Sequence, residues 1–300
     1  MRAEAGGLLN ASKPDRFDVI CAGEALWNAS APTASSASAA TAAAMRFQPG
    51  GGAVNAAVAL AREGRRVGLA TTLIDDTFGR LLLERVASLG VDVGGVSLAV
   101  PTDSIVFYDG TSGQVVNFRD EDQAFAIPEN WSAEVLLLSG LSPVVSRAAA
   151  LCKSARAARR MGTMVVIDVN AKLHVWAGRD PRAVHMVLRE ADVVRFSTAD
   201  LAVLGMEIHE VRSKLRPNAI LLTSNPSGIT WVTGPFGELT CAPKSLDTIL
   251  PRGAGDAFTA ALCGELARKG DLAENQIATW DRALRQGLAA ACSAASRARA

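Results

Sequence analysis

The sequence predicts an α/β protein with a central, mostly parallel sheet flanked by helices and a small antiparallel sheet beside it. Short apolar runs alternate with helix-length segments from residue 131 to residue 223, which is typical of βαβ units. Two strand-like runs within residues 104–118 instead follow each other directly. The connecting residues 109–113 contain two glycines, so this part predicts an antiparallel hairpin. A small sheet beside a larger one is suited to act as a lid.

The composition limits the classes of protein to which the chain can belong. The chain has 300 residues, of which 49% are hydrophobic and 20% charged, so it can bury a substantial core. Its formal net charge is +1, with acidic and basic residues interleaved, and this gives no sign of a nucleic-acid partner. The five cysteines are widely spaced and form no CxxC pair. No apolar run approaches the ~20 residues that cross a bilayer, so we expect a cytoplasmic protein without a membrane partner.

Residues 1–16 predict a disordered tail, because they are polar and rich in small side chains. Residues 17–300 predict a single α/β domain. We expect the lid strands to be drawn from about residues 24–49 and 91–120.

The other elements follow from the same signals, taken in order along the chain. A glycine run opens a helix over residues 53–63, which Gly64 stops, and an amphipathic helix over residues 76–89 ends at Gly90. The remaining strands are expected at residues 17–22, 67–72, 135–139, 163–168, 193–196, 219–223, 229–233 and 238–241. The remaining helices are expected at residues 144–161, 181–190, 199–204, 257–268 and 280–297.

Ligands of parallel α/β sheets bind beyond the carboxyl ends of the strands. The segments that follow these ends here are residues 23–28, 168–172, 197–200 and 223–228, together with the loop before Asp256. We therefore expect the site to be built from these segments.

The glycine turn before Asp256 points to a particular chemistry. Free amides at a helix start bind anions, and a carboxylate at the same place can remove a proton. The combination suggests phosphoryl transfer to a hydroxyl group. A purely structural turn is the alternative, since glycine-rich turns often open helices.

A second glycine turn, at residues 50–52, precedes Asn55. The Asn55 amide can donate to and accept from a ligand hydroxyl, whereas a small-residue packing contact is the alternative. Arg119 closes the second lid strand and could reach an anion or a polyol, although a surface arginine is the simpler interpretation.

Two motifs, in this order and separation, make the chain resemble the ribokinase family of PfkB carbohydrate kinases. GGGAVN at residues 50–55 is similar to the family's GGxxxN, and GAGD at residues 253–256 is similar to its second signature. The resemblance implies a ribokinase-like fold and transfer of the ATP γ-phosphoryl group to a sugar or sugar acid, as in fructokinases or 2-keto-3-deoxygluconate kinases. A nucleoside kinase or a weakly active nucleotide- or sugar-binding protein on this scaffold is the alternative.

The resemblance implies a role for each residue of the second motif. Asp256 would be the general base, and the amides of Gly253, Ala254 and Gly255 would form the anion hole. Arg252 is a candidate for added positive charge from its position alone.

The resemblance also implies an acceptor site. Gly50, Gly51 and Asn55 would hold the sugar, together with Asp256 and with Arg119 from the lid. Asn28 stands where the family usually has an aspartate, so it keeps hydrogen-bonding capacity but loses the charge.

The nucleotide side is implied in the same way, with ATP and Mg²⁺ as cofactors. The residues expected there are Asn170, Lys172, Ser197, Asp200, Thr223, Asn225, Gly228 and Gly255. Asp200 is also expected to contact Mg²⁺ weakly, through water. Residues 250–252 lack the acidic residue that the family associates with a monovalent cation, which leaves that cation open. A homodimer through the lid is a further expectation.

Overall fold

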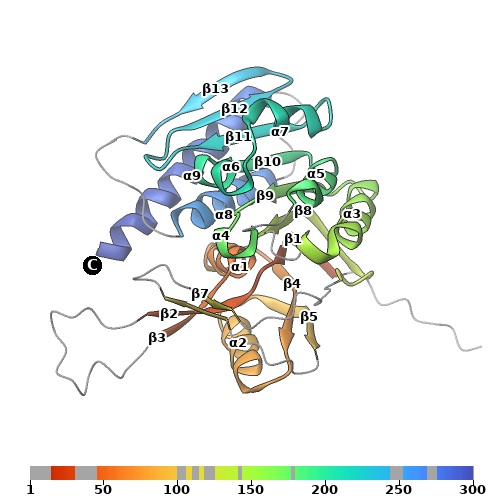
Figure 1. Ribbon diagram of the computed structural model, residues 1–300, viewed down its shortest axis with the longest axis vertical. Coiled ribbons are helices and arrows are strands. Elements are labelled where there is room, and N and C mark those ends of the chain that lie inside the picture. Colours follow the sequence, from red (N-terminus) through yellow and green to blue (C-terminus); the bar gives the residue numbers. More distant parts are fainter. Residues whose placement is uncertain are drawn as a thin grey trace, which may run out of the picture.

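The computed structural model describes residues 15–30, 46–99, 106–109, 115–117, 126–140, 144–176, 180–243, 253–268 and 276–299. These residues form a nine-stranded sheet between two layers of helices and a separate four-stranded sheet (Figure 1). The predicted α/β architecture, with a mostly parallel sheet and a small lid sheet, is confirmed.

The main sheet is built from β1 (Asp15–Gly23), β4 (Val67–Ile74), β5 (Asp92–Ala99), β8 (Trp131–Ser139), β9 (Met164–Asp168), β10 (Val193–Ser197), β11 (Ile220–Ser224), β12 (Thr230–Gly234) and β13 (Gly237–Cys241). Its order is β13-β12-β11-β10-β9-β8-β1-β4-β5. Pairings from β5 to β11 are parallel, and β12 and β13 add an antiparallel edge. The carboxyl ends of the central strands therefore meet at one edge of the sheet, which is where ligands of such sheets bind.

The helices divide between the two faces of the main sheet (Figure 1). One face packs against α1 (Gly52–Arg62), α2 (Thr77–Ala87), α8 (Ala254–Leu266) and α9 (Gln276–Arg299). The other packs against α3 (Val144–Arg160), α4 (Leu173–Trp176), α5 (Arg182–Leu188), α6 (Thr198–Leu204) and α7 (Ile208–Lys214). None of the helices within the described residues has both the length and the apolar character that a membrane span requires.

The central strand β8 shows why the sheet needs cover on both faces. Val135 and Leu137 join the core beneath α1 and α8, whereas Leu136 and Leu138 join the core beneath α3 and α5. Successive side chains of a strand point to opposite faces, so a continuous apolar run is buried only between two helical layers.

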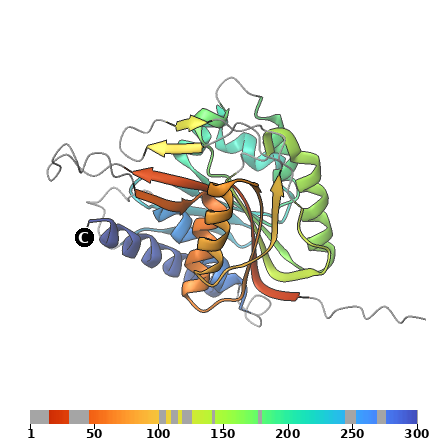
Figure 2. The ribbon, with the colours of Figure 1, turned by 90° about the horizontal axis from the view of Figure 1, so that it is seen from below.

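The small sheet consists of β2 (Leu26–Ser30), β3 (Arg46–Gly50), β6 (Val106–Asp109) and β7 (Val115–Asn117), in the order β3-β2-β6-β7. It extends to one side of the main body (Figure 2). Two antiparallel pairs meet in a parallel pairing of β2 with β6. The predicted hairpin is confirmed, because β6 pairs antiparallel with β7.

Two boundaries differ from the expectation. The range 91–120, from which lid strands were expected, supplies β6 and β7 but also contains β5, which pairs parallel with β4, because α2 between them makes a βαβ crossover that returns the chain to the main sheet. Asp15 and Arg16 belong to β1 rather than to the tail, since they pair with Trp131 and Ser132. Residues 1–14 lie outside the described residues.

The fold predicts a large stability difference between two leucines. Leu137 is fully buried in β8, whereas Leu81 on α2 is 49% exposed. Leu137→Ala should lower the free energy of unfolding by about 2–5 kcal/mol, because it leaves a cavity in the core. Leu81→Ala should change it by roughly 0.5 kcal/mol or less. Urea denaturation followed by circular dichroism measures both, and equal losses would contradict this placement of β8.

Candidate active site

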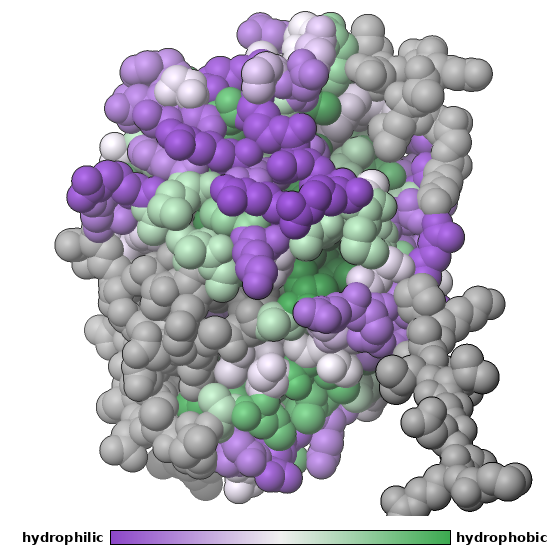
Figure 3. Space-filling view, turned by 90° about the vertical axis from the view of Figure 1, so that its right-hand side faces the viewer, coloured by the Kyte–Doolittle hydropathy of each residue, from purple (hydrophilic) through white to green (hydrophobic). Residues whose placement is uncertain are grey.

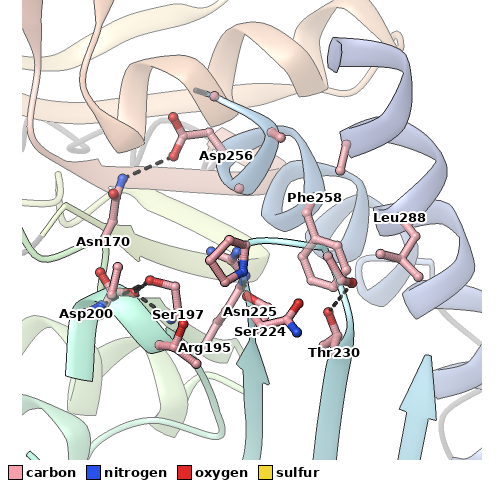
Figure 4. Close-up of a pocket in the computed structure, with 18 residues that line it drawn as sticks. Asn170, Arg195, Ser197, Asp200, Ser224, Asn225, Thr230, Asp256, Phe258 and Leu288 are labelled. Atoms are coloured by element: carbon pink, nitrogen blue, oxygen red, sulfur yellow. Dashed lines mark hydrogen bonds between the residues drawn. The ribbon is translucent and has the colours of Figure 1, made fainter. Parts of the chain in front are cut away.

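A cavity of about 360 Å³ lies beyond the carboxyl ends of β9, β10 and β11, against the start of α8 (Figure 4). The residues of its lining that the sequence singled out are Asn170, Ser197, Asp200, Asn225, Gly228, Gly253, Ala254, Gly255 and Asp256. Segments far apart in the chain are thus brought together at the edge of the sheet where a ligand was expected.

The half-buried carboxylate of Asp256 is held by two amides. Its Oδ2 accepts a hydrogen bond from Nδ2 of Asn55 at 2.7 Å, and its Oδ1 accepts one from Nδ2 of Asn170 at 3.1 Å. Asn55 comes from the first turns of α1, and Asn170 comes from the loop after β9. The two glycine motifs of the sequence therefore meet at this carboxylate, and its orientation is fixed.

Burial raises the pKa of Asp256 to about 6, and the nearby negative charge of Asp168 adds to this effect. The hydrogen bond from Asn55 acts in the opposite direction, as do the charges of Lys172 and Arg195. A carboxyl group with a pKa near 6 is ionised at neutral pH and is a stronger base than a free aspartate.

The turn before Asp256 has the conformation that an anion site needs. Gly253 lies in the left-handed region, with φ 81°, and α8 begins at Ala254. The Ala257 amide donates to the Gly253 carbonyl at 2.9 Å, so the amides of Ala254 and Gly255 precede the first helical hydrogen bond. The helix start that the predicted anion hole requires is present three residues earlier than expected.

Asn170 is the only non-glycine residue with a positive φ in the described part of the chain, at 41°. Its Oδ1 accepts a hydrogen bond from Nζ of Lys172 at 2.6 Å. Lysine can only donate, so this contact turns the amide NH₂ group toward Asp256. Lys172 itself does not line the cavity, and it acts on Asp256 through Asn170 and through its charge.

Asp200 anchors the wall of the cavity. Its Oδ2 accepts from the backbone and the hydroxyl of Ser197 at 2.6 and 2.7 Å, in a capping box at the start of α6. Its Oδ1 accepts from the Ala171 amide at 2.7 Å. Burial raises the pKa of Asp200. Among the described residues no three acidic, histidine or cysteine side chains gather to hold a metal, and the Mg²⁺ contact of Asp200 stays a prediction.

The opposite end of the cavity is apolar. Figure 4 shows Phe258 and Leu288 on the side away from Asp200 and Asn170. Asn225 shapes the adjoining turn, because its Oδ1 accepts from the Ile229 amide at 3.0 Å.

The expected contact at Thr223 is replaced by its neighbour. Ser224 lines the cavity and Thr223 does not, because successive side chains of β11 point to opposite faces.

Sequence reasoning missed Arg195 on β10. Its guanidinium is buried and donates from Nη1 to Oδ1 of Asp168 at 2.9 Å and from Nη2 to Oγ of Ser224 at 3.1 Å. An arginine inside an apolar strand was the available signal, because a buried charge requires a partner.

The expected acceptor residues lie where the lid meets α1. Gly51 has φ 92°, and a Cβ there would lie 2.2 Å from the carbonyl oxygen of Glu24. A Cβ on Gly50 would lie 2.2 Å from Nδ2 of Asn28, so the Asn28 amide rests against this turn. Arg119 and Arg252 lie outside the described residues.

A second cavity, of about 380 Å³, borders α3 and is mostly apolar, with Trp131 and Leu136 in its lining. On that face of the molecule, hydrophobic residues surround a hollow between hydrophilic ones (Figure 3). Among its described lining residues Glu129 is the one carboxylate, and it is exposed. This cavity therefore lacks the buried base that the first one contains.

The fold and the site together are those of a ribokinase-like α/β protein. The chain belongs to the pfkB family of carbohydrate kinases, whose family model matches residues 16–300.

Two curated relatives illustrate the range of the family. The chain is 30% identical over 260 residues to fructokinase-1 of Oryza sativa subsp. japonica, covering 77% of each chain. It is 29% identical over 173 residues to 5-dehydro-2-deoxygluconokinase of Clostridium perfringens. That match covers 52% of this chain and 50% of the relative, so it spans about half the relative's length.

Solved structures share the fold. Aminoimidazole riboside kinase from Salmonella enterica, complexed with aminoimidazole riboside and an ATP analogue, superposes with a TM-score of 0.73 at 21% identity. Fructokinase from Vibrio cholerae, bound to fructose, ADP and calcium, superposes with a TM-score of 0.74 at 22% identity. Each match covers 94% of this chain and 93% of the other, and at such identities it establishes the fold alone.

The geometry predicts how Asn55 tunes the base. Asn55→Ala removes a hydrogen bond to the ionised carboxylate, so the pKa of Asp256 should rise above about 6. A carboxyl ¹³C NMR titration of the aspartates measures this, with the Asp256 signal assigned by its loss in Asp256→Asn. Asn130→Ala, which removes an amide that contacts Asp15 instead, is the control and should leave the Asp256 signal unchanged. An unshifted Asp256 signal in Asn55→Ala would contradict the contact.

Proposed function

We propose that this protein transfers the γ-phosphoryl group of ATP to a hydroxyl of a sugar or sugar acid, with Asp256 as the general base. The observation that carries the proposal is the place of Asp256: a half-buried carboxylate with a pKa of about 6, in the first turn of α8, bordering the cavity. A base and a helix start at one spot suit a reaction that removes a proton while it stabilises phosphate charge.

The two ends of the cavity suggest how the nucleotide binds. Phe258 and Leu288 offer apolar surface for the adenine, and the turn at Gly253 offers amides to the phosphates. In this orientation the γ-phosphate points toward Asp256. Asn225 and Gly228, at the wall between these ends, would contact the nucleotide.

Asp256 would take the proton from the acceptor hydroxyl as the phosphoryl group moves. Asn55 and Asn170 hold one carboxylate oxygen each, so the base cannot rotate away from the acceptor. Phosphoryl transfer depends chiefly on positioning and on stabilising the charge of the moving group. A fixed carboxylate beside free amides meets both needs.

We assign Mg²⁺ to the phosphates rather than to a protein cage, since the described residues offer no cluster of three metal-ligating side chains. Bound there, Mg²⁺ would neutralise charge on the transferring group. Asp200 would reach it through water.

The acceptor class follows from the turn between the lid and α1. Asn55, Gly51 and Asn28 present amides and backbone groups suited to hydroxyls. The relatives named fructokinase and 5-dehydro-2-deoxygluconokinase support a sugar or sugar acid. The proposal includes closure of the lid over the acceptor, with Arg119 as a contact, because exclusion of water prevents hydrolysis of ATP. It also includes pairing of two copies of the chain through the lid.

The test is ADP release with ATP, Mg²⁺ and a panel of sugars, sugar acids and nucleosides. Asp256→Asn should lower kcat by about 10²–10⁴-fold with the preferred acceptor, because the general base is lost. Asp281→Asn is the matched control: it removes an exposed carboxylate that pairs with Arg285 on α9, and it should leave kcat unchanged.

Three outcomes separate the candidate functions. Release with a sugar or sugar acid supports the proposal, whereas release with nucleosides alone would replace it with a nucleoside kinase. Nucleotide binding without acceptor-dependent release would favour the binding protein.

A further inference from the structure

Arg195 has an unusual position for a charged side chain. It stands in the middle of β10 and its side chain is only 10% exposed. The guanidinium carbon lies 5.3 Å from the centre of the Phe258 ring, and Nη2 would lie 3.2 Å from a Cβ at Gly255. The charge is therefore packed beneath the first turn of α8, on the floor of the cavity.

The partner of Arg195 links it to the same helix. Asp168, at the end of β9, is completely buried. Its Oδ1 accepts from Arg195, and its Oδ2 accepts from Oγ1 of Thr259 at 2.7 Å. Thr259 lies three residues after Asp256 in α8. A continuous polar connection thus runs from β10 through β9 to the helix that carries Asp256.

By itself, this set of polar contacts contributes little to the stability of the fold. Nε of Arg195 is buried without a hydrogen-bond partner among the described residues. A buried ion pair often contributes no more to stability than apolar side chains of similar volume would. Its place between the cavity and α8 points to a use in the reaction.

The pair also determines the electrostatic surroundings of Asp256. Asp168 raises the pKa of Asp256, whereas Arg195 lowers it, and the effect of Asp168 is the larger of the two. Lys172 also lowers it, and α1 contributes the neutral Asn55. On α9, Arg282 pairs with Glu265 near the end of α8, and Arg285 pairs with Asp281.

We propose that Arg195 is a positioning residue for phosphoryl transfer: with Asp168 it fixes the start of α8 and neutralises a buried negative charge beside the base. The inference rests on the proposed role of Asp256 as that base. Arg195 makes no contact with the acceptor in this scheme and acts through Asp168 and the turn.

The two halves of the pair should shift the base in opposite directions. Arg195→Met leaves the Asp168 charge uncompensated. The acid limb of the plot of kcat against pH, which reports the ionisation of the base, should therefore move up by about one pH unit. Asp168→Asn leaves the Arg195 charge uncompensated, so the limb should move down, and by at least as much, because Asp168 has the larger effect. In Arg195→Met/Asp168→Asn both charges are gone, and the limb should lie between the positions of the two single variants.

Further variants separate this role from a structural one. Arg195→Lys keeps the charge and should keep the limb in place while it lowers kcat, because it loses the two-pronged contact to Asp168 and Ser224. Arg216→Met, which breaks the partly exposed pair with Asp192, is the matched control and should leave the limb unmoved.

The same set is titrated by carboxyl ¹³C NMR, which reads Asp256 directly without turnover. If Arg195→Met does not fold, Asp168→Asn and the double variant still give one predicted downward shift and its partial reversal. The inference would be overturned if the acid limb of kcat and the titration midpoint of the Asp256 signal both stayed at their wild-type pH values in Arg195→Met and in Asp168→Asn. If the wild type releases no ADP with any acceptor, the proposed function fails, and the NMR titration still decides the role of Arg195.

Discussion

The buried carboxylate of Asp168 is the contact on which the site depends. It ends β9, accepts from Arg195 on the neighbouring β10, and accepts from Thr259 on α8. A fully buried carboxylate is tolerated only when its oxygens have partners, so the three elements must take up one arrangement. That arrangement places the start of α8 over the carboxyl ends of the strands, and the cavity forms between them.

The buried carboxylate of Asp256 lowers the stability of the fold when it is ionised. Its native pKa lies near 6, above the value of about 4 for an aspartate in an unfolded chain. The native state therefore holds this proton to higher pH than the unfolded state does, and the contribution of Asp256 to stability decreases as the pH rises from about 4 to about 6. The ionised form is less stable in the fold, and it is also the form that can accept a proton. Asn55 and Asn170 limit the cost, since each donates a hydrogen bond to the carboxylate.

The two glycine turns solve related geometric problems on either side of Asp256. Gly51 lets the chain pass within contact distance of the Glu24 carbonyl, where any side chain would collide, and Asn55 follows at the start of α1. Gly253 takes a left-handed conformation that frees the first amides of α8. Both helices point their amino ends toward Asp256, so the positive ends of two helix dipoles lie near one carboxylate. This convergence suits a site in which anionic phosphate and a base must stay close.

The sequence alone determined the alternation of strands and helices, both glycine turns and the carboxylate of Asp256 at a helix start, because apolar periodicity and turn chemistry are local properties. It also singled out Asn55 and Asn170 as candidate site residues. The tertiary structure alone decided that these amides hold Asp256, since the contacts join residues 201 and 86 positions apart. It also decided that β5 joins the main sheet and that Arg195 finds Asp168. Pairing between strands and the partners of a buried charge depend on which segments the fold brings together, and no local pattern of residues records that choice.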